Sequence, residues 1–459
     1  MASDRADIVV AGADLVVTMD VTRREIPGGW VAITDGWVSG VGGPGTEPEA
    51  ARVISAAGGL VTPGLINTHH HIYQNLTRAF APALDGNLFH WLRTLYPVWS
   101  RLDEEAAYVS AWIGLCELAM GGCTTSTDHL YVHPRGGGDL ISAEIAAATE
   151  LGFRFHPTRG SMSLSEKDGG LPPDSVVQDD DEILADSQRL VEIHHDPNPG
   201  AMVRIALAPC SPFSVTPELM ARTAELAETL DVRLHTHLAE DEDENAFCEA
   251  AFGCRPIEKF EEVGWGSDRS WVAHCVYPSP AEIVRLGQWG TGVAHCPSSN
   301  QLIGAGLAPV RELRDAGVHV GLGCDGSAST DHASLWMETR AALLLARLRG
   351  GPQAMLAREA LEIATLGGAA CLGRDDIGSL EMGKAGDLVI WPTSGISFAG
   401  ALTDPVEALV RCGPVAPSHT IVAGNLLVEG GVVTAGGVEE MLRRHRSIAQ
   451  EWVDAYRAG

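Results

Sequence analysis

The chain has 459 residues, and its 45% hydrophobic and 20% charged residues are typical of an ordinary globular protein. Its 60 acidic residues outnumber 32 basic ones, and the formal net charge of −28 argues against nucleic acid and anionic membranes as partners. The length suits one large α/β domain with a smaller companion.

The first 20 residues, MASDRADIVVAGADLVVTMD, contain Asp and Arg where a secretory signal needs a long apolar run. No segment reaches the roughly 20 apolar residues of a membrane span. The ten cysteines are scattered without a Cys-x-x-Cys pair, which favours reduced core thiols over a disulfide framework. These features predict a cytoplasmic protein.

Residues 7–60 are short β-rich pieces separated by Gly and Asp, as in antiparallel hairpins. The same pattern returns in residues 386–393 and 419–433, where Gly424-Asn425 marks a hairpin turn. We therefore predict one small β-sandwich-like domain built from both chain ends, followed by a closing helix. The expected boundaries are residues 1–61 with 376–435 for this composite β domain, and 436–459 for the helix.

The middle of the chain, residues 62–375, alternates short apolar strands with amphipathic helical segments. Eight such units predict an α/β fold of the (β/α)8 TIM-barrel type. A doubly wound open sheet is the competing fold, but no Gly-x-Gly-x-x-Gly follows a strand, which disfavours it. The eight strands are expected at residues 60–71, 124–130, 153–159, 202–209, 231–240, 270–275, 290–296 and 319–327.

Polar residues collect where these strands end, at the face on which barrel enzymes place their chemistry. In the triplet His69-His70-His71, alternation along a strand puts His69 and His71 on one face and His70 on the other. Such a pair is either a hydrogen-bonded polar strand end or a metal-binding pair. Buried imidazoles cost stability unless a partner holds them, so the accumulation of histidines at other strand ends favours a metal ion.

Two further strand ends complete a ligand set. His237 comes from the fifth strand and Asp325 from the eighth, and Glu240 follows His237 by three residues. This set of three histidines and one carboxylate suits Zn²⁺, with Fe²⁺ and Mn²⁺ as alternatives.

Several motifs resemble those of a known superfamily. PGLINTHHH, residues 63–71, resembles the Pro-Gly-Leu-Ile-(Asp/Asn)-x-His-x-His signature of the amidohydrolase superfamily. HTHLAE, AHC, AHCPSSN and GCDGSAS resemble, in this order, the later motifs of its cytosine, guanine and adenosine deaminase branch. NTHHHIYQNLTRA, TTSTDHLYVHP, RGSMSLSEKDGGLPPDSVV and APCSPFSV are similar to 8-oxoguanine deaminases, with the s-triazine hydrolases as near cousins.

The resemblance implies a role for each matching residue. His69, His71, His237 and Asp325 would be metal ligands. The catalytic residues would be Glu240 as proton shuttle, His274 as a hydrogen-bond partner of the attacking hydroxide, and Asp325 as its proton acceptor. The substrate would contact Gln74, Glu240, His274 and His295, and the ring pocket would also include Tyr131, Arg159 and Trp91.

Some of these residues have a purely structural role as the alternative. Glu240 could only orient His237, and His295 could be structural. His129 is undecided between the site and the core. Four other histidines, His156, His194, His195 and His332, are expected at the surface or in loops.

Members of the superfamily with two metal ions bridge them by a carboxylated lysine on a middle strand. The only lysines here are Lys167, Lys259 and Lys384, and none is expected to end a strand. We therefore predict one Zn²⁺ per subunit.

The implied reaction is metal-dependent hydrolytic deamination of an amino-substituted purine or related heterocycle, with 8-oxoguanine giving uric acid and ammonia as the first hypothesis. Glu240 and Asp325 together favour a deaminase, which must protonate a ring nitrogen. The alternatives are an isocytosine- or guanine-type deaminase, an s-triazine amino- or chlorohydrolase and, more remotely, an inactive metal-binding protein. We expect a homo-oligomer that acts on a small heterocyclic molecule.

Overall fold

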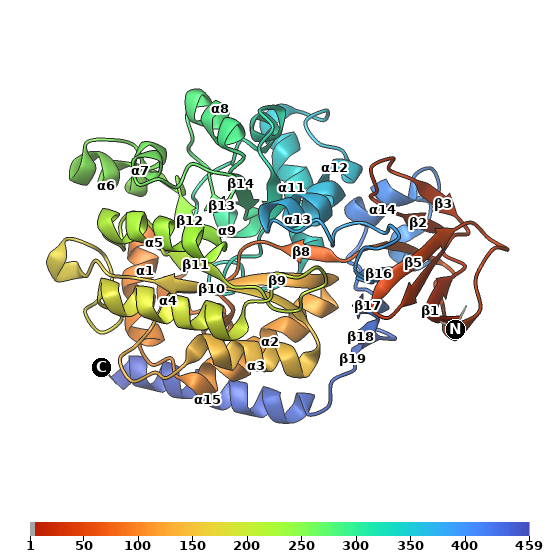
Figure 1. Ribbon diagram of the computed structural model, residues 1–459, viewed down its shortest axis with the longest axis horizontal. Helices are drawn as coiled ribbons and strands as arrows, with labels where there is room; N and C mark the ends of the chain where they lie inside the picture. Colours follow the sequence, from red (N-terminus) through yellow and green to blue (C-terminus); the bar gives the residue numbers. More distant parts are fainter. Residues whose placement is uncertain (1–4, 459) are drawn as a thin grey trace.

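The computed structural model describes residues 5–458, so residues 1–4 and 459 of the predicted terminal segments lie outside the described range. Eight parallel strands close into a barrel surrounded by helices, and a separate β domain lies at one side (Figure 1). The predicted fold class, a TIM barrel with a small β domain from both chain ends, is confirmed. Within the described residues, no helix is long and apolar enough to cross a membrane.

The barrel follows chain order around its circumference and closes where the eighth strand pairs with the first. Its strands are fully buried or nearly so, because helices cover the outside and side chains fill the inside. They are β8 (Leu65–Asn67), β9 (Cys123–Leu130), β10 (Arg154–Ser161), β11 (Ala206–Pro209), β12 (Arg233–Leu238), β13 (Ser270–His274), β14 (Gly292–His295) and β15 (Val320–Leu322).

The helices begin and end where the local sequence predicts. Asp103, Thr216 and Ser279 accept backbone N–H groups at helix starts, and Gly152 and Gly290 end helices in the left-handed conformation. The helices of the barrel region are α1 (Leu88–Trp99), α2 (Glu104–Met120), α3 (Leu140–Leu151), α4 (Asp180–His194), α5 (Pro217–Leu230), α6 (Glu242–Phe252), α7 (Pro256–Glu262), α8 (Pro280–Trp289), α9 (Pro297–Leu302), α10 (Val310–Asp315), α11 (Leu335–Gly350), α12 (Ala357–Glu362) and α13 (Gly368–Cys371). Short 3-10 segments are η1 (Ile72–Thr77), η2 (Ala81–Ala83), η3 (Glu166–Asp168) and η5 (Ile396–Phe398), and η4 (Ile363–Gly367) is a π-helical segment.

The β domain consists of two sheets whose inner faces share an apolar core that includes Ile8, Val31, Leu388 and Ile421. One sheet has the order β5-β4-β1-β6 and the other β19-β18-β17-β16-β7-β2-β3, so strands from both chain ends pair. The strands are β1 (Ala6–Ala11), β2 (Leu15–Val17), β3 (Glu25–Pro27), β4 (Trp30–Thr34), β5 (Trp37–Gly42), β6 (Ala50–Ser55), β7 (Gly59–Pro63), β16 (Leu388–Pro392), β17 (His419–Val422), β18 (Asn425–Glu429) and β19 (Val432–Val433), with α14 (Pro405–Arg411) between β16 and β17.

A buried ion pair joins the β domain to the amino end of the barrel. Arg154, the first residue of β10, donates from Nε and Nη2 to the two carboxylate oxygens of Asp387 at 2.9 and 3.0 Å. The Asp387 carboxylate also accepts the N–H of Ala423 at 2.8 Å, and Arg154 Nη1 donates to two backbone carbonyls. The pair therefore has its hydrogen-bonding groups satisfied inside the protein.

The C-terminal helix α15 (Val438–Ala458) returns to the barrel and runs beside α2 (Figure 1). Its His445 Nε2 donates to Asn75 Oδ1 at 2.8 Å, and Asn75 Nδ2 in turn donates to the carbonyl of Ser110 on α2. Arg444 forms an ion pair with Glu105 on the same helix. These contacts tie the end of the chain to the segment that follows β8.

One expectation about the histidines is wrong. His156, expected at the surface or in a loop, lies buried on β10 with its ring 6.0 Å from that of Trp271. His156 belongs to the predicted strand FRFHPTR, but its polar ring favoured a surface or loop position. Because both faces of a barrel strand are covered, even a polar residue on such a strand is removed from water.

Candidate metal centre and active site

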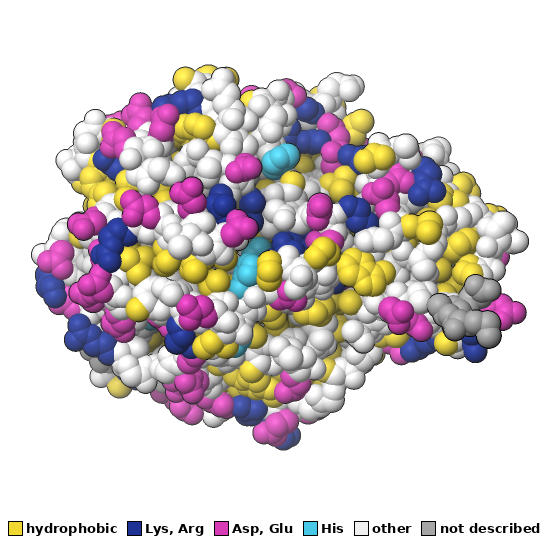
Figure 2. Space-filling model, viewed as in Figure 1, with side chains coloured by type: hydrophobic (Ala, Val, Ile, Leu, Met, Phe, Trp, Pro, Cys, Tyr) yellow, Lys and Arg dark blue, Asp and Glu magenta, His cyan; other side chains and the backbone are white. Residues whose placement is uncertain are grey.

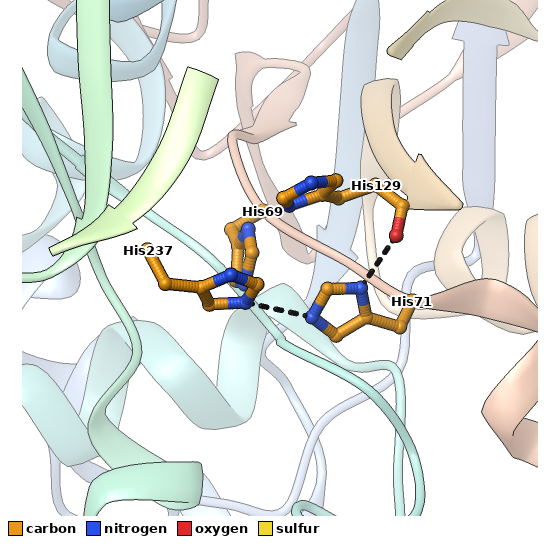
Figure 3. Close-up of side chains that lie close together, drawn as sticks. All are labelled: His69, His71, His129 and His237. Atoms are coloured by element: carbon orange, nitrogen blue, oxygen red, sulfur yellow. Dashed lines mark hydrogen bonds between the residues drawn. The ribbon is translucent and has the colours of Figure 1, made fainter. Parts of the chain in front are cut away.

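The ends of three barrel strands bring three histidines and one aspartate together. His69 and His71 follow β8, His237 lies on β12, and Asp325 follows β15. The Nε2 atoms of His71 and His237 are 3.1 Å apart, and Asp325 Oδ1 lies 3.4 and 3.3 Å from Nε2 of His69 and His71. Figure 3 shows the rings of His69, His71 and His237 facing a common centre, with His129 beside them.

Backbone carbonyls determine the tautomers of two of these rings. His71 Nδ1–H donates to the carbonyl of His129 at 2.7 Å, and His237 Nδ1–H donates to the carbonyl of Cys210 at 2.7 Å (Figure 3 shows the first). A neutral imidazole carries one proton, so Nε2 of each ring keeps its lone pair. Both Nε2 atoms are therefore prepared as ligands.

A relay orients the third ring in the same way. His235 Nδ1–H donates to the carbonyl of Trp271 at 2.9 Å, which leaves His235 Nε2 as the acceptor for His69 Nδ1–H at 2.8 Å. His235 also stacks on the Trp271 ring at 4.4 Å. His69 Nε2, which is buried and has no hydrogen-bond donor or acceptor partner among the described residues, consequently presents a lone pair to the same centre.

These three rings fit a bound cation. Burial lowers the pKa of His69 and His237 well below the ordinary value and also lowers that of His71, so the rings are neutral. Neutral rings with these tautomers point lone pairs at one another across 3.1 Å, which is repulsive unless a positive charge lies between them. The donor set of three imidazoles and one carboxylate is one that Zn²⁺ accepts.

Asp325 is held in an unusual backbone conformation beside these rings. Its φ is 61°, in the left-handed region that non-glycine residues rarely adopt, and His274 has a φ of 68°. Strained residues of this kind persist at functional sites where the surrounding structure imposes them. Burial favours the neutral acid, but His69, whose Nε2 lies 3.4 Å from Oδ1, and the nearby His274 and His71 hold the pKa of Asp325 well below its ordinary value.

Next to Asp325, the chain passes close to Gln74. A Cβ at Gly326 would lie 1.8 Å from Gln74 Oε1, so a larger residue here would displace the Gln74 amide. The Gly326 N–H donates to Asp325 Oδ1 at 2.7 Å. The second glycine of the motif GCDGSAS thus leaves room for Gln74 beside the predicted ligand loop.

Two more groups face the same centre from the fifth and sixth strands. His274 Nε2 lies 3.6 Å from Glu240 Oε1 and 3.8 Å from Asp325 Oδ2, and His274 Nδ1–H donates to Asn300 Oδ1 at 3.0 Å. Burial, with the nearby charges of Asp241 and Asp325, raises the pKa of Glu240 well above its ordinary value. A protonated carboxyl and a carboxylate thus both lie within 4 Å of the same imidazole nitrogen.

A cavity opens above these groups and is mostly lined by apolar and aromatic side chains. The sequence predicts seven of its lining residues as site residues: His71, Trp91, Tyr131, His237, Glu240, His274 and Asp325. It did not indicate α1, which places three further side chains there. It also missed Asn300, the hydrogen-bond partner of His274, although Asn300 belongs to the AHCPSSN motif. The lining residues that it missed are Leu88, Leu92, Tyr96, Cys210, Phe213, Ser299, Ile303 and Ser329.

Three of the predicted substrate contacts lie elsewhere in this structure. Arg159 donates to Asp186, Gln178 and the carbonyl of Gly160. Gln74 donates from Nε2 to Tyr131 Oη at 3.4 Å, and its Oε1 is buried against Gly326. His295 is buried with Nδ1 unpaired among the described residues. None of the three is among the described residues that line the cavity.

Size alone would not have located this site. A wider hollow, lined by His133, Arg135 and Arg189 among others, contains none of the predicted ligands. The visible face of the molecule carries Asp and Glu side chains spread among Lys and Arg (Figure 2). The chemistry of the strand ends, not the volume of a depression, identifies the site.

Comparison with known proteins gives the family. The model of the amidohydrolase family matches residues 60–427, which include all eight barrel strands and the residues just described. The chain therefore belongs to the amidohydrolase family. It is a metal-dependent hydrolase of the kind that acts on C–N bonds.

Characterised relatives include several enzymes that act on nitrogen heterocycles. The chain is 46% identical to an 8-oxoguanine deaminase of Pseudomonas aeruginosa, over 92% of this chain and 94% of the relative. It is 37% identical to a hydroxydechloroatrazine ethylaminohydrolase of Pseudomonas sp. strain ADP, over 94% and 92% of the two chains. Among solved structures, atrazine chlorohydrolase of Arthrobacter aurescens TC1 complexed with zinc superposes with a TM-score of 0.91 at 34% identity, covering 96% of this chain and 100% of the other.

Proposed function

We propose that this protein is a zinc-dependent deaminase of an amino-substituted purine or related heterocycle, and that 8-oxoguanine, converted to uric acid and ammonia, is its substrate. The observation that carries the proposal is the approach of both Glu240 and Asp325 to His274, beside three imidazole lone pairs. The 46% identity to an 8-oxoguanine deaminase supports the choice of ring.

His69, His71, His237 and Asp325 would hold one Zn²⁺ per subunit. When bound, such an ion would polarise water and lower its pKa to about 7. The three lysines support a single ion, because Lys167 and Lys259 lie on η3 and α7 and Lys384 in a turn, away from the barrel strand ends. Fe²⁺ and Mn²⁺ would accept the same ligands.

Asp325, His274 and Glu240 would position the attacking water and transfer protons. Asp325, ionised because the histidines hold its pKa low, accepts a proton from the attacking water. His274, oriented by Asn300, presents Nε2 to that water. Glu240, protonated because burial raises its pKa, delivers a proton to the ring nitrogen that becomes negative when the adjacent carbon turns tetrahedral. The proton that Asp325 accepted from the water then reaches the amine, which leaves as ammonia, and the ionised Glu240 recovers a proton from the new hydroxyl group as the carbonyl forms.

The cavity suits a planar ring. Trp91, Tyr96, Tyr131 and Phe213 supply aromatic surface, and Glu240 and His274 supply polar groups at one end. Such a combination of apolar walls with a few directed polar groups is typical of small-molecule sites.

The test is an ammonia-release assay on metal-analysed enzyme. We expect about one zinc per chain, ammonia from 8-oxoguanine, and loss of that ammonia in Glu240→Gln with zinc retained. Glu242→Gln, an exposed carboxylate two residues further on, is the matched control and should leave activity unchanged. Absence of ammonia release from 8-oxoguanine, isocytosine and guanine alike would reject the proposal.

A second function is supported by the relatives that act on s-triazines. The same polarised water and the same cavity would serve hydrolysis of an amino- or chloro-s-triazine, and the chain is 37% identical to a hydroxydechloroatrazine ethylaminohydrolase. Values of kcat/KM on a panel of purines and s-triazines would rank the two. An s-triazine rate above the 8-oxoguanine rate would favour this second function.

We further propose that the enzyme works as a cytoplasmic homo-oligomer without nucleic-acid or membrane partners. For the domains, we propose that residues 62–375 form the catalytic barrel. Residues 1–61 and 376–435 would form the β domain, and residues 436–459 the closing helix. The acidic surface supports the absence of anionic partners. Light scattering of the purified protein measures the oligomeric state.

A further inference from the structure

Behind the metal centre lies a pair of buried carboxyl groups that the proposed reaction does not use. Asp128 is on β9 and Glu144 is on α3, and both are 0% exposed. Asp128 Oδ2 and both carboxylate oxygens of Glu144 lack a hydrogen-bond donor among the described residues. Three unsatisfied buried oxygens in one place require an explanation.

Each carboxyl group is the missing hydrogen-bond partner of the other. Each is the hydrogen-bonding neighbour of the other, and no Lys, Arg or His among the described residues forms an ion pair with either. Two carboxylates cannot both ionise in such a site, and burial raises the pKa of each. With Glu144 as the neutral acid, its O–H donates to Asp128 Oδ2, and both buried groups gain a partner.

The other oxygen of Asp128 leads to the metal centre. Asp128 Oδ1 accepts the N–H of Ile72, the residue directly after His71, at 2.6 Å. Two more hydrogen bonds join the same two segments: His129 N–H donates to the His70 carbonyl at 2.7 Å, and His71 Nδ1–H donates to the His129 carbonyl at 2.7 Å. The segment after β8 is thus clamped to the end of β9 on both sides of His71.

We propose that Glu144 is a positioning residue for the metal centre: its carboxyl group donates a hydrogen bond to Asp128, and Asp128 holds the Ile72 N–H and thereby the ring of His71. This inference rests on the proposed function, since it assigns a task only if His71 is a ligand. Removal of a group hydrogen-bonded directly to a metal ligand typically changes metal affinity 10- to 100-fold, and this range sets the scale of the effect expected for Glu144.

The test uses metal-free protein titrated with zinc against a competing chelator, together with hydrogen exchange of the segment containing Ile72. Glu144→Leu removes the donor, and we expect zinc affinity to fall about 10- to 100-fold and exchange at Ile72 to accelerate. Glu144→Gln keeps a neutral donor and should retain wild-type values in both measurements. Ile141→Ala, a buried apolar change one turn away on α3, is the control for simple destabilisation and should leave zinc affinity unchanged.

The outcomes separate this inference from the proposed function. It is overturned if Glu144→Leu binds zinc as the wild type does, if Glu144→Gln loses as much as Glu144→Leu, or if Ile141→Ala loses zinc equally. If Glu144→Leu does not fold, Glu144→Asp replaces it: the shorter acid should weaken zinc binding although it keeps the charge type, and wild-type binding would reject the inference. Wild-type protein that binds no zinc would reject the metal centre and, with it, this role for Glu144.

Discussion

The two ends of the barrel treat buried polar groups in opposite ways. At the amino end, Arg154 and Asp387 satisfy each other with two hydrogen bonds and use their remaining groups on nearby backbone. At the carboxyl end, His69 Nε2 lacks a partner among the described residues, and Asp325 and His274 have strained backbones. The amino end of the barrel is arranged for stability. The carboxyl end keeps atoms free to bind a metal ion or transfer a proton, and this lowers its stability.

The largest expected effect is a loss of activity from a substitution at the carboxyl end of the barrel that leaves the amino end unchanged. Glu240→Gln removes the transferable proton but keeps the size of the side chain, so kcat should fall about 10²- to 10⁴-fold while zinc content stays at the wild-type value. Steady-state ammonia release with metal analysis of the same sample measures both. Retained activity would make Glu240 only an orienting partner of His237.

The matching change at the amino end should have the reverse profile. Arg154→Met leaves Asp387 buried without its cation, and the free energy of unfolding should fall by about 3–5 kcal/mol. Because Arg154 lies at the start of β10, the folded fraction should keep its kcat. Chemical denaturation and activity at low temperature measure the two quantities, and an unchanged stability would contradict the role given to this ion pair.

A smaller effect tests how the carboxyl end prepares its ligands. His235→Phe keeps the stacking on Trp271 but removes the acceptor for His69 Nδ1–H, so zinc affinity should fall about 10- to 100-fold. His156→Phe, another buried histidine near Trp271, is the control and should bind zinc like the wild type. Equal losses in both variants would show that the packing around Trp271, not the relay, is responsible.

The smallest effect is a change in the pH dependence of stability. Burial raises the pKa of Glu338 to about 8, and its carboxylate accepts the Ser298 N–H at 3.0 Å. The unfolded chain releases this proton near pH 4.5 and the folded chain only near pH 8, so stability falls as pH rises between these values. Glu338→Gln should flatten that decline, as followed by denaturation at several pH values, and an unchanged slope would contradict the assignment.

Much of this protein was determined by its sequence alone. The alternation of side chains along a strand separates His69 and His71 from His70, because successive residues point to opposite faces of any strand. The periodic alternation of apolar strands and helices specifies a barrel, because each apolar face must be covered. The β-rich ends indicate a shared domain for the same reason.

Only the tertiary structure decided how these residues cooperate. The carbonyls of His129, Cys210 and Trp271 determine the tautomers of the rings, and they come from neighbouring strands whose register no local pattern reveals. The same holds for α1 over the cavity and for the approach of Glu144 to Asp128, which depends on how α3 packs on the barrel. Sequence periodicity specifies which face is buried, but the partner that a buried polar atom meets depends on contacts between residues distant in the chain.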